Sequence, residues 1–188
     1  MTMQVREKTI EEIEAKLTQM NTALNKLNYL ETAIREPDFN YEIKRFLWKQ
    51  ASELYKERKM YEKAAKAMAN KASTEITIKD RIESFLSAAE LYAKCGKVEE
   101  ADNMFVKAAR EASIEQKEKI KLAKKNIYIV FAKKLEKNNK KGTAIKFYEK
   151  LIKMQIDPIE KTLIKEKLQT TYKTLGMFRE AKLLDGIR

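Results

Sequence analysis

The residues that most often carry chemistry are scarce in this 188-residue chain. It has no histidine, the commonest general base and metal ligand in proteins. Its single cysteine, Cys95, therefore lacks a histidine that could activate it, and it cannot form an internal disulfide. The four glycines are too far apart to form a phosphate-binding loop, since they stand at Gly96, Gly142, Gly176 and Gly186. We therefore predict a protein that is not an enzyme and that binds no metal or cofactor.

The composition is that of a folded and highly charged chain. Hydrophobic residues make up 44% and charged residues 36% of the sequence, with only two prolines, which is unlike a disordered chain. The carboxylates stand among lysines at spacings typical of exposed helix faces, so we interpret them as solvated rather than catalytic. No apolar run approaches the ~20 residues of a membrane span, and the N-terminus lacks the apolar core of a secretory signal. These features predict a cytoplasmic protein.

Almost the whole chain has helical periodicity. The best strand candidate is the run EITI at residues 75–78, which we expect to lead into a helix, and Pro37 marks a break. Three capping motifs predict helix starts, namely Thr9 with Glu12, Ser113 with Gln116, and Asp157 with Pro158 and Glu160. We expect about eight or nine helices and no sheet.

The sequence also contains a weak internal repeat. Four segments superpose at separations of 37, 43 and 37 residues when aligned on Ala64, Ala101, Ala144 and Ala181. The clearest copy has aromatic, small and glycine residues in a fixed order: Phe85, Ala88, Ala89, Tyr92, Gly96, Ala101, Phe105 and Ala108. This order is typical of two antiparallel helices that approach closely at alanines. Gly96 and Gly176 are the predicted helix C-caps, because glycine readily adopts the left-handed conformation.

The repeat resembles the tetratricopeptide repeat. The phrases ASELYKERKMYEKAAKAM and SAAELYAKCGKVEEADNMFVKAA carry the resemblance, although Lys59 replaces glycine at the turn of the first copy. Coverage runs from about Tyr41 to Leu184, with two good copies and two partial ones. The separations exceed the usual 34 residues, as in the soluble NSF-attachment protein-like group with its long helical hairpins. The resemblance implies an all-α fold, a right-handed superhelical stack of antiparallel helical hairpins, that is, an α-solenoid.

The resemblance also implies a binding surface. Tetratricopeptide domains usually bind peptides or helices on a concave face that the first helix of each hairpin lines. The matching positions in this sequence are Lys49, Glu53, Lys56, Leu86, Glu90, Lys94, Ile129, Lys133 and Lys137. Members that clamp a chaperone tail use asparagine where this chain has Glu53 and Glu90, which argues against such a clamp.

The N-terminal segment, residues 1–36, has a different pattern from the repeat domain, residues 37–188. Its apolar residues follow heptad spacing through Leu27, at Ile10, Ile13, Leu17, Met20, Leu24 and Leu27, and Ile34 lies beyond them with Leu30 nearby. One interpretation is a capping helix, or a hairpin bent near Asn21, that covers the first repeat. The other is a coiled-coil seam for a partner or a second copy of the chain. We favour the cap, and hence a monomer.

Positive charge is concentrated in one part of the chain. Residues 116–156 contain 13 Lys and Arg against 3 Asp and Glu, whereas the whole chain has a net charge of +12. The basic patch predicted there consists of Lys117, Lys121, Lys124, Lys125, Lys140, Lys141, Lys146, Lys150 and Lys153. Such a patch favours an acidic protein, a nucleic acid or an anionic membrane surface, and lysine-rich helices are also simply soluble. The aromatic residues within this segment have core spacing and are expected to be buried.

Two functions remain open from the sequence. The first is a non-catalytic scaffold that binds another protein, acidic or helical, on its concave face. The alternative is polyanion binding, to nucleic acid or an anionic membrane surface, through the lysines of residues 116–156.

Overall fold

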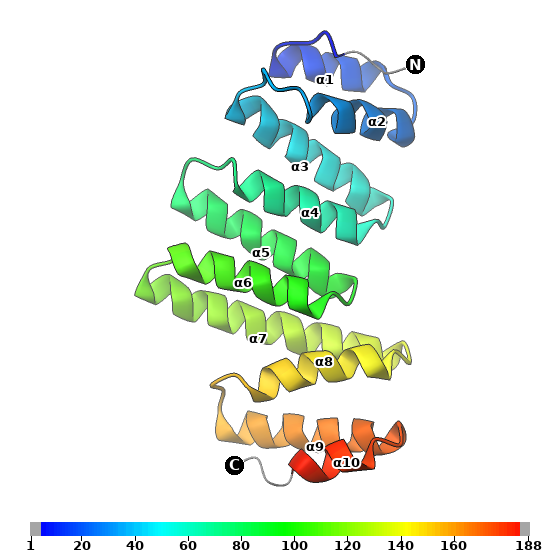
Figure 1. The fold of residues 1–188 in the computed structure, drawn as a ribbon, viewed down its shortest axis with the longest axis vertical. Helices are drawn as coiled ribbons and strands as arrows, with labels where there is room; N and C mark the ends of the chain where they lie inside the picture. The colour runs from blue at the N-terminus through cyan, green and yellow to red at the C-terminus, as the bar shows by residue number, and fades with distance from the viewer. Residues whose placement is uncertain (1–4, 185–188) are drawn as a thin grey trace. The chain divides into compact units, whose positions relative to one another are not determined.

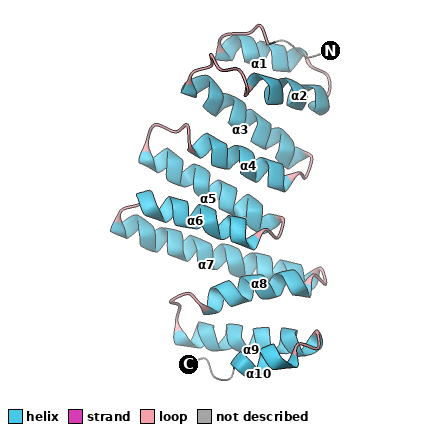
Figure 2. Ribbon diagram, in the orientation of Figure 1, coloured by secondary structure: helices cyan, strands magenta, loops and turns pink. Residues whose placement is uncertain are grey.

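The structure, a computed structural model, describes residues 5–184, so Gly186 lies outside it. This part of the chain forms ten α-helices and no strand (Figures 1 and 2). The helices are α1 (Ile10–Gln19), α2 (Ala23–Ala33), α3 (Tyr41–Glu57), α4 (Tyr61–Ala72), α5 (Ile78–Lys94), α6 (Val98–Glu111), α7 (Ile114–Lys137), α8 (Lys141–Ile152), α9 (Pro158–Thr174) and α10 (Phe178–Leu183). The all-α prediction is confirmed.

The helices group into two compact units. Unit 1 extends to Lys117 and contains α1–α6, and unit 2 begins at Glu118 and contains most of α7 together with α8–α10. The division into residues 1–36 and 37–188 stays a prediction. Within unit 1, buried side chains of α1 and α2 share one apolar core with those of α3 and α4.

The N-terminal segment is bent rather than continuous. Helix α1 ends at Gln19, and Thr22 begins α2 by accepting a hydrogen bond from the backbone N–H of Asn25 at 3.2 Å. Ile13, Leu17, Leu27 and Leu30 are buried in the core of unit 1, whereas Leu24 is 53% exposed. The heptad pattern is therefore divided between two short helices, as the bent-hairpin interpretation expects. This break, together with the short α10, accounts for ten helices where about eight or nine were expected.

The predicted helix starts are present. Thr9 and Glu12 form a reciprocal capping box, and Ser113 and Gln116 bond each other's backbone N–H groups at 3.3 and 2.9 Å. Asp157 accepts from the N–H groups of Ile159 at 2.9 Å and of Glu160 at 3.3 Å, with proline in the first helical turn. These local motifs were read correctly because each depends on a few neighbouring residues.

Four tight turns join α3 to α4, α5 to α6, α7 to α8 and α9 to α10, and they share one backbone geometry. The residues with positive φ are Lys59 (59°), Gly96 (79°), Asn139 (58°) and Gly176 (74°). In each turn the next backbone N–H donates to a carbonyl five residues back, at 2.8–2.9 Å, the Schellman pattern that ends a helix. Gly96 and Gly176 have the left-handed conformation predicted for them, one residue beyond Cys95 and Leu175, which are the C-cap residues of α5 and α9. Figure 1 shows the two helices of each pair running in opposite directions.

The aligned alanines occupy equivalent buried positions. Ala64, Ala101 and Ala144 are fully buried, and Ala181 is 2% exposed. Each lies five residues after the positive-φ residue of its turn, one helical turn into the second helix. A methyl side chain at this position allows the two helices of a hairpin to approach closely, which is the role that the sequence pattern predicted.

In each unit, a tyrosine hydroxyl links a hairpin to the helix that precedes it. The hydroxyl of Tyr55 on α3 donates to Glu31 on α2, and that of Tyr172 on α9 donates to Glu149 on α8 at 2.5 Å. Burial raises the pKa of both phenols, and the hydrogen bond to the carboxylate raises it further. Both tyrosines therefore remain protonated donors at neutral pH, and each fixes the first helix of one hairpin against the preceding helix.

Candidate functional site

The nine residues predicted to bind a partner are divided between the two units. Those on α3 and α5 are mostly charged and solvent-facing: Lys49, Lys56, Glu90 and Lys94 are exposed, and Glu53 and Leu86 are half-buried. Those on α7 belong to unit 2, where Ile129 is half-buried and Lys133 and Lys137 are exposed. The predicted residues therefore fall into two sets, one in each unit.

A groove of about 530 Å³ in unit 2 brings two of these predicted residues together with α9. We call it the α7–α9 groove, and the residues that define it are Ile129, Lys133 and Glu136 of α7 and Leu163, Ile164 and Lys167 of α9. Leu163 is 60% exposed although it is apolar. The groove thus combines an accessible apolar surface with lysines on both sides.

A second cavity, of about 700 Å³, lies further along the same two helices. It is lined by Leu122 and Lys125 of α7, Glu160 of α9 and Ile156 of the preceding loop. The ammonium of Lys125 donates to both carboxylate oxygens of Glu160, at 3.1 and 2.8 Å. Because Glu160 lines both cavities, this ion pair stands between them and holds α7 and α9 in register.

Glu136 anchors one wall of the α7–α9 groove. Its carboxylate accepts from the hydroxyl of Tyr148 on α8 at 3.0 Å and from that of Thr171 on α9 at 3.2 Å. The ammonium of Lys167 lies 3.5 Å away. Burial raises the pKa of Tyr148, with a further contribution from the hydrogen bond to Glu136, so the phenol stays a donor. Three helices are therefore tied to one carboxylate, which gives the groove a fixed shape.

The predicted basic patch is spread over two helices and the turn between them. Lys117, Lys140, Lys146 and Lys153 are exposed, and Lys121, Lys124, Lys125, Lys141 and Lys150 are half-buried. Part of the charge is already engaged in the fold, since Lys125 pairs with Glu160 and the ammonium of Lys121 lies 3.8 Å from Glu118. Tyr128, Phe131, Phe147 and Tyr148 are buried, and this confirms that they are core residues.

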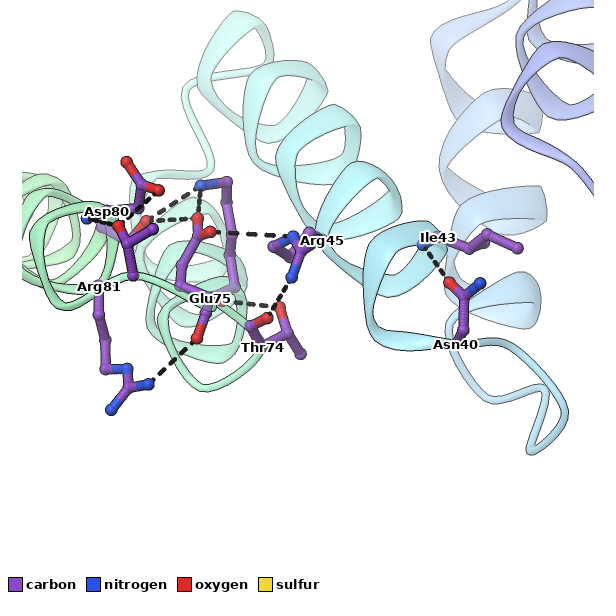
Figure 3. Close-up of polar contacts among 10 residues, drawn as sticks. Asn40, Ile43, Arg45, Thr74, Glu75, Asp80 and Arg81 are labelled. Atoms are coloured by element: carbon purple, nitrogen blue, oxygen red, sulfur yellow. Dashed lines mark hydrogen bonds and ion pairs between the residues drawn. The ribbon is translucent and has the colours of Figure 1, made fainter.

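Unit 1 contains a polar cluster that the sequence did not predict (Figure 3). Glu75 lies in the loop between α4 and α5, and its side chain is 8% exposed. Its carboxylate pairs with Lys71 of α4, lies 3.8 Å from Arg45 of α3 and accepts from Ser84 of α5 at 3.3 Å. The cluster therefore fixes the loop to three helices and has a structural role.

The backbone of the same loop is held as well. Arg45 donates to the carbonyl of Thr74 at 2.7 Å, and Arg81 donates to the carbonyl of Glu75 at 3.1 Å (Figure 3). Arg81 also pairs with Glu111 of α6 at 2.8 Å. Thr77 then caps α5 by accepting from the N–H of Asp80 at 3.0 Å. The run EITI thus leads into a helix, as expected from the sequence.

Groups suited to metal binding do not gather in the described part of the chain. No cluster of three or more His, Cys, Asp or Glu side chains there is arranged to hold a metal ion. The Cys95 thiol donates to the carbonyl of Tyr92 at 3.2 Å, and partial burial raises its pKa, so it is mainly protonated at neutral pH. None of the helices described has the length and apolar character needed to cross a membrane.

Comparison with known proteins gives no match. The chain matches no protein-family model, no curated protein and no solved structure. The function is therefore inferred from the geometry of the α7–α9 groove and the sequence that forms it.

Several groove residues were missed by the sequence analysis. Ile129 and Lys133 were predicted from the sequence, whereas Leu163, Ile164 and Lys167 were not, because the fourth repeat copy is only partial. One signal could have found them. Helix α9 has a second column of apolar residues, Ile159 and Leu163, beside its buried residues Ile164 and Leu168, and an amphipathic helix needs only one such column.

Proposed function

We propose that this chain is a non-catalytic, tetratricopeptide-like scaffold that binds a segment of another protein in the α7–α9 groove. The observation that carries this proposal is Leu163, an apolar side chain that is 60% exposed in a groove between two first helices. Ile129 lies in the same groove, with Lys133 and Lys167 beside it. An apolar floor with lysine flanks suits a helix or peptide that presents apolar side chains together with acidic ones.

The charge of unit 2 supports an acidic partner. Unit 2 has 19 Lys and Arg against 8 Asp and Glu in its sequence, a net charge of +11. Unit 1 has 21 Lys and Arg against 20 Asp and Glu, a net charge of +1. A strongly positive surface accelerates association with an acidic protein and discriminates against a basic one. The partner would thus be selected by charge and held by the apolar contact.

The four equivalent turns and buried alanines support the repeat architecture that this function uses. We propose that the hairpins stack as a right-handed α-solenoid, with the first helices on the concave face. The repeat spacing favours the group with long hairpins, similar to the soluble NSF-attachment proteins. The burial of Ile13, Leu17 and Leu30 in one core with α3 and α4 supports a cap at the N-terminus, and hence a monomer. We propose that it acts in the cytoplasm, as the sequence predicts.

Polyanion binding is the second candidate function, and the exposed lysines Lys140, Lys146 and Lys153 favour it. Aromatic side chains that could stack on bases are buried in this segment, which leaves only contacts to phosphate. Binding of this kind weakens steeply with salt, by about 0.7–0.9 in log affinity per log salt for each phosphate contacted. A salt titration with single-stranded DNA therefore separates it from binding in an apolar groove.

Affinity capture with three variants tests the main proposal. The unmodified protein and the Leu163→Asp, Ile129→Asp and Val130→Asp variants would be immobilised and exposed to a lysate of the source organism. Val130 is the matched control, because it is apolar, 58% exposed and on α7, but does not line the groove. A partner of the groove should be retained by the unmodified protein and by Val130→Asp, and at least about 10-fold less by the two groove variants, since an aspartate would be desolvated there.

The pattern across the variants decides the outcome. A protein retained equally by Leu163→Asp and by the unmodified chain would show that the groove is not the binding site. Retention that falls equally in all three variants would indicate a nonspecific effect of added negative charge. Circular dichroism of each variant is the control for folding.

A further inference from the structure

Residues of α2, α3 and α4 in unit 1 line a pocket of about 310 Å³. Its apolar lining comes from Ile34 at the end of α2, from Trp48 and Ala51 on α3, and from Ala67 on α4. Trp48 is the only tryptophan in the chain, and it is half-buried. We call this cavity the Trp48 pocket.

The aromatic residue at the position of Trp48 recurs in the next two hairpins, where it is covered. Trp48, Phe85 and Tyr128 each stand eleven residues before the positive-φ residue of the turn that follows. Phe85 is 6% exposed and Tyr128 is fully buried, whereas Trp48 borders an open pocket. The first hairpin therefore leaves accessible an aromatic surface that the other two hairpins bury.

One position on the second helix accounts for the opening. Eight residues after the positive-φ residue, the chain has Ala67 on α4, Met104 on α6 and Phe147 on α8. Met104 is 7% exposed and Phe147 is fully buried, and the Phe147 ring meets that of Tyr128 edge-on with centroids 5.3 Å apart. Ala67 has only a methyl group, so the first hairpin lacks the large side chain that fills this position in the other two.

Most charged groups in the lining of the Trp48 pocket already have partners. The carboxylate of Glu31 accepts from the hydroxyl of Tyr55 and lies 3.7 Å from the ammonium of Lys63. The ammonium of Lys66 lies 3.0 Å from Glu62 on the same helix. These side chains are therefore engaged in the fold of unit 1.

Two polar groups of the lining have no hydrogen-bond or ion-pair partner among the described residues, the guanidinium of Arg35 and the carboxamide of Asn70. Both can donate through N–H groups, and the guanidinium is always positively charged. Its planar fork matches the two oxygens of a carboxylate, which it binds through two parallel hydrogen bonds. The polar groups of the pocket thus suit a carboxylate, and its apolar lining suits a ring.

We propose that the Trp48 pocket binds a small aryl carboxylate, whose ring packs against Trp48 and whose carboxylate is bound by Arg35 and Asn70. The volume is at the lower end of the ~300–1,000 Å³ typical of small-molecule sites, so the ligand is small, with a single ring. Aromatic pairs gain stability beyond the area that they bury. The site belongs to unit 1 and does not depend on the function proposed for the α7–α9 groove of unit 2.

Three simple compounds test the proposal. Phenylpropionate is the probe, phenylpropylamine keeps the ring but carries a positive charge, and propionate keeps the carboxylate without the ring. The indole N–H of Trp48 gives a single signal in a heteronuclear NMR spectrum, because the chain has one tryptophan. Phenylpropionate should shift this signal and bind at least about 10-fold more tightly than either other compound, since each of them lacks one of the two recognised groups.

Filling the pocket should prevent binding. Ala67→Met copies the residue that stands at this position in the next hairpin, so the variant should fold, and it should bind phenylpropionate at least about 10-fold more weakly. Ala69→Met is the matched control, because Ala69 is on the same helix but does not line the pocket. This control should change the affinity less than about 2-fold.

A second pair of variants tests the contact to the carboxylate. Arg35→Gln removes the charge of an exposed residue, so it should leave the fold intact and lower the affinity for phenylpropionate at least about 5-fold. Its affinity for neutral phenylpropanol should stay within about 2-fold of that of the unmodified protein. Arg58→Gln, which changes an exposed arginine of unit 1 outside the lining, should alter neither affinity.

Four outcomes would overturn the proposal. Equal affinities for phenylpropionate and phenylpropylamine would show that charge plays no part in recognition, and an unchanged Trp48 signal would show that the pocket stays empty. Equal losses in Ala67→Met and Ala69→Met would place the ligand elsewhere, as would full binding by Arg35→Gln. The first two results come from the unmodified protein, so they do not depend on any variant folding.

Discussion

The first helices of the two units differ at an exposed position that is equivalent in all four hairpins. Seventeen residues before the positive-φ residue of each turn, the chain has Glu42 on α3, Lys79 on α5, Leu122 on α7 and Ile159 on α9. All four side chains are exposed, Leu122 by 54% and Ile159 by 73%. The position is charged in unit 1 and apolar in unit 2, which is the difference expected if only unit 2 buries this surface against a partner.

The aligned buried alanines, by contrast, are the same in both units. Alanine recurs at Ala64, Ala101, Ala144 and Ala181, because each hairpin needs a small side chain where its helices meet. The repeat therefore contains two kinds of position. Positions that recur in both units maintain the hairpin, and positions that differ between units are free to determine what each unit binds.

The two units also differ in how a partly buried carboxylate ties their helices together. Glu75 in unit 1 is surrounded by cations, with Arg45 and Lys71 only 19% and 18% exposed. Glu136 in unit 2 is surrounded mainly by hydroxyl donors, Tyr148 and Thr171. The first arrangement is a nearly buried ion cluster, and the second is a hydrogen-bonded anchor.

The largest effect is expected from removing Glu75. Glu75→Ala leaves two nearly buried cations without a carboxylate, so we expect the free energy of unfolding to fall by about 3 kcal/mol. Glu136→Ala should cost less, about 1–2 kcal/mol, because its main partners are neutral hydroxyls. Urea unfolding followed by circular dichroism measures both. A larger loss from Glu136→Ala would contradict the distinction between the two units.

Much of the fold could be predicted because its signals are local. Asp157 with Pro158 begins a helix, and Gly96 follows the end of one. Ala101, five residues after Gly96, marks the place where the two helices of that hairpin approach closely. Lys59 and Asn139 have nearly the same positive φ, and this conformation was predicted for neither of them, because neither is glycine. Asparagine tolerates this conformation, and the pair Asn138–Asn139 was the available signal.

The sites were less predictable because they join residues that are distant in the sequence. Arg45 reaches the carbonyl of Thr74, and Lys125 pairs with Glu160 35 residues further on. Lysine and glutamate are so frequent in this sequence that no single pair stands out before the helices are placed. The α7–α9 groove similarly requires two helices, of which only α7 contributed predicted residues.

Replacing the aligned alanines with leucine tests whether the hairpins of both units need a small side chain at this position. Ala101→Leu in unit 1 and Ala144→Leu in unit 2 each insert three carbons at a fully buried position, so both should lower the free energy of unfolding by about 1–3 kcal/mol. Val106→Leu, at a position 41% exposed on α6, is the control and should change it by less than about 0.5 kcal/mol. If only one alanine variant is destabilised, the alanines are not equivalent.

The smallest effect is expected at the turns, where each unit has one positive-φ residue that is not glycine. A left-handed backbone costs most L-residues about 1–2 kcal/mol, and glycine removes this cost while making the unfolded chain more flexible by up to about 1 kcal/mol. Lys59→Gly should therefore raise the free energy of unfolding by about 0.5–1 kcal/mol. Asn139→Gly should raise it by no more than about 0.5 kcal/mol, because asparagine already tolerates φ near 58°. Thermal unfolding of the two variants beside the unmodified protein measures the difference, and a greater gain at Asn139 would show that tertiary contacts, rather than backbone preference, determine the stability of these turns.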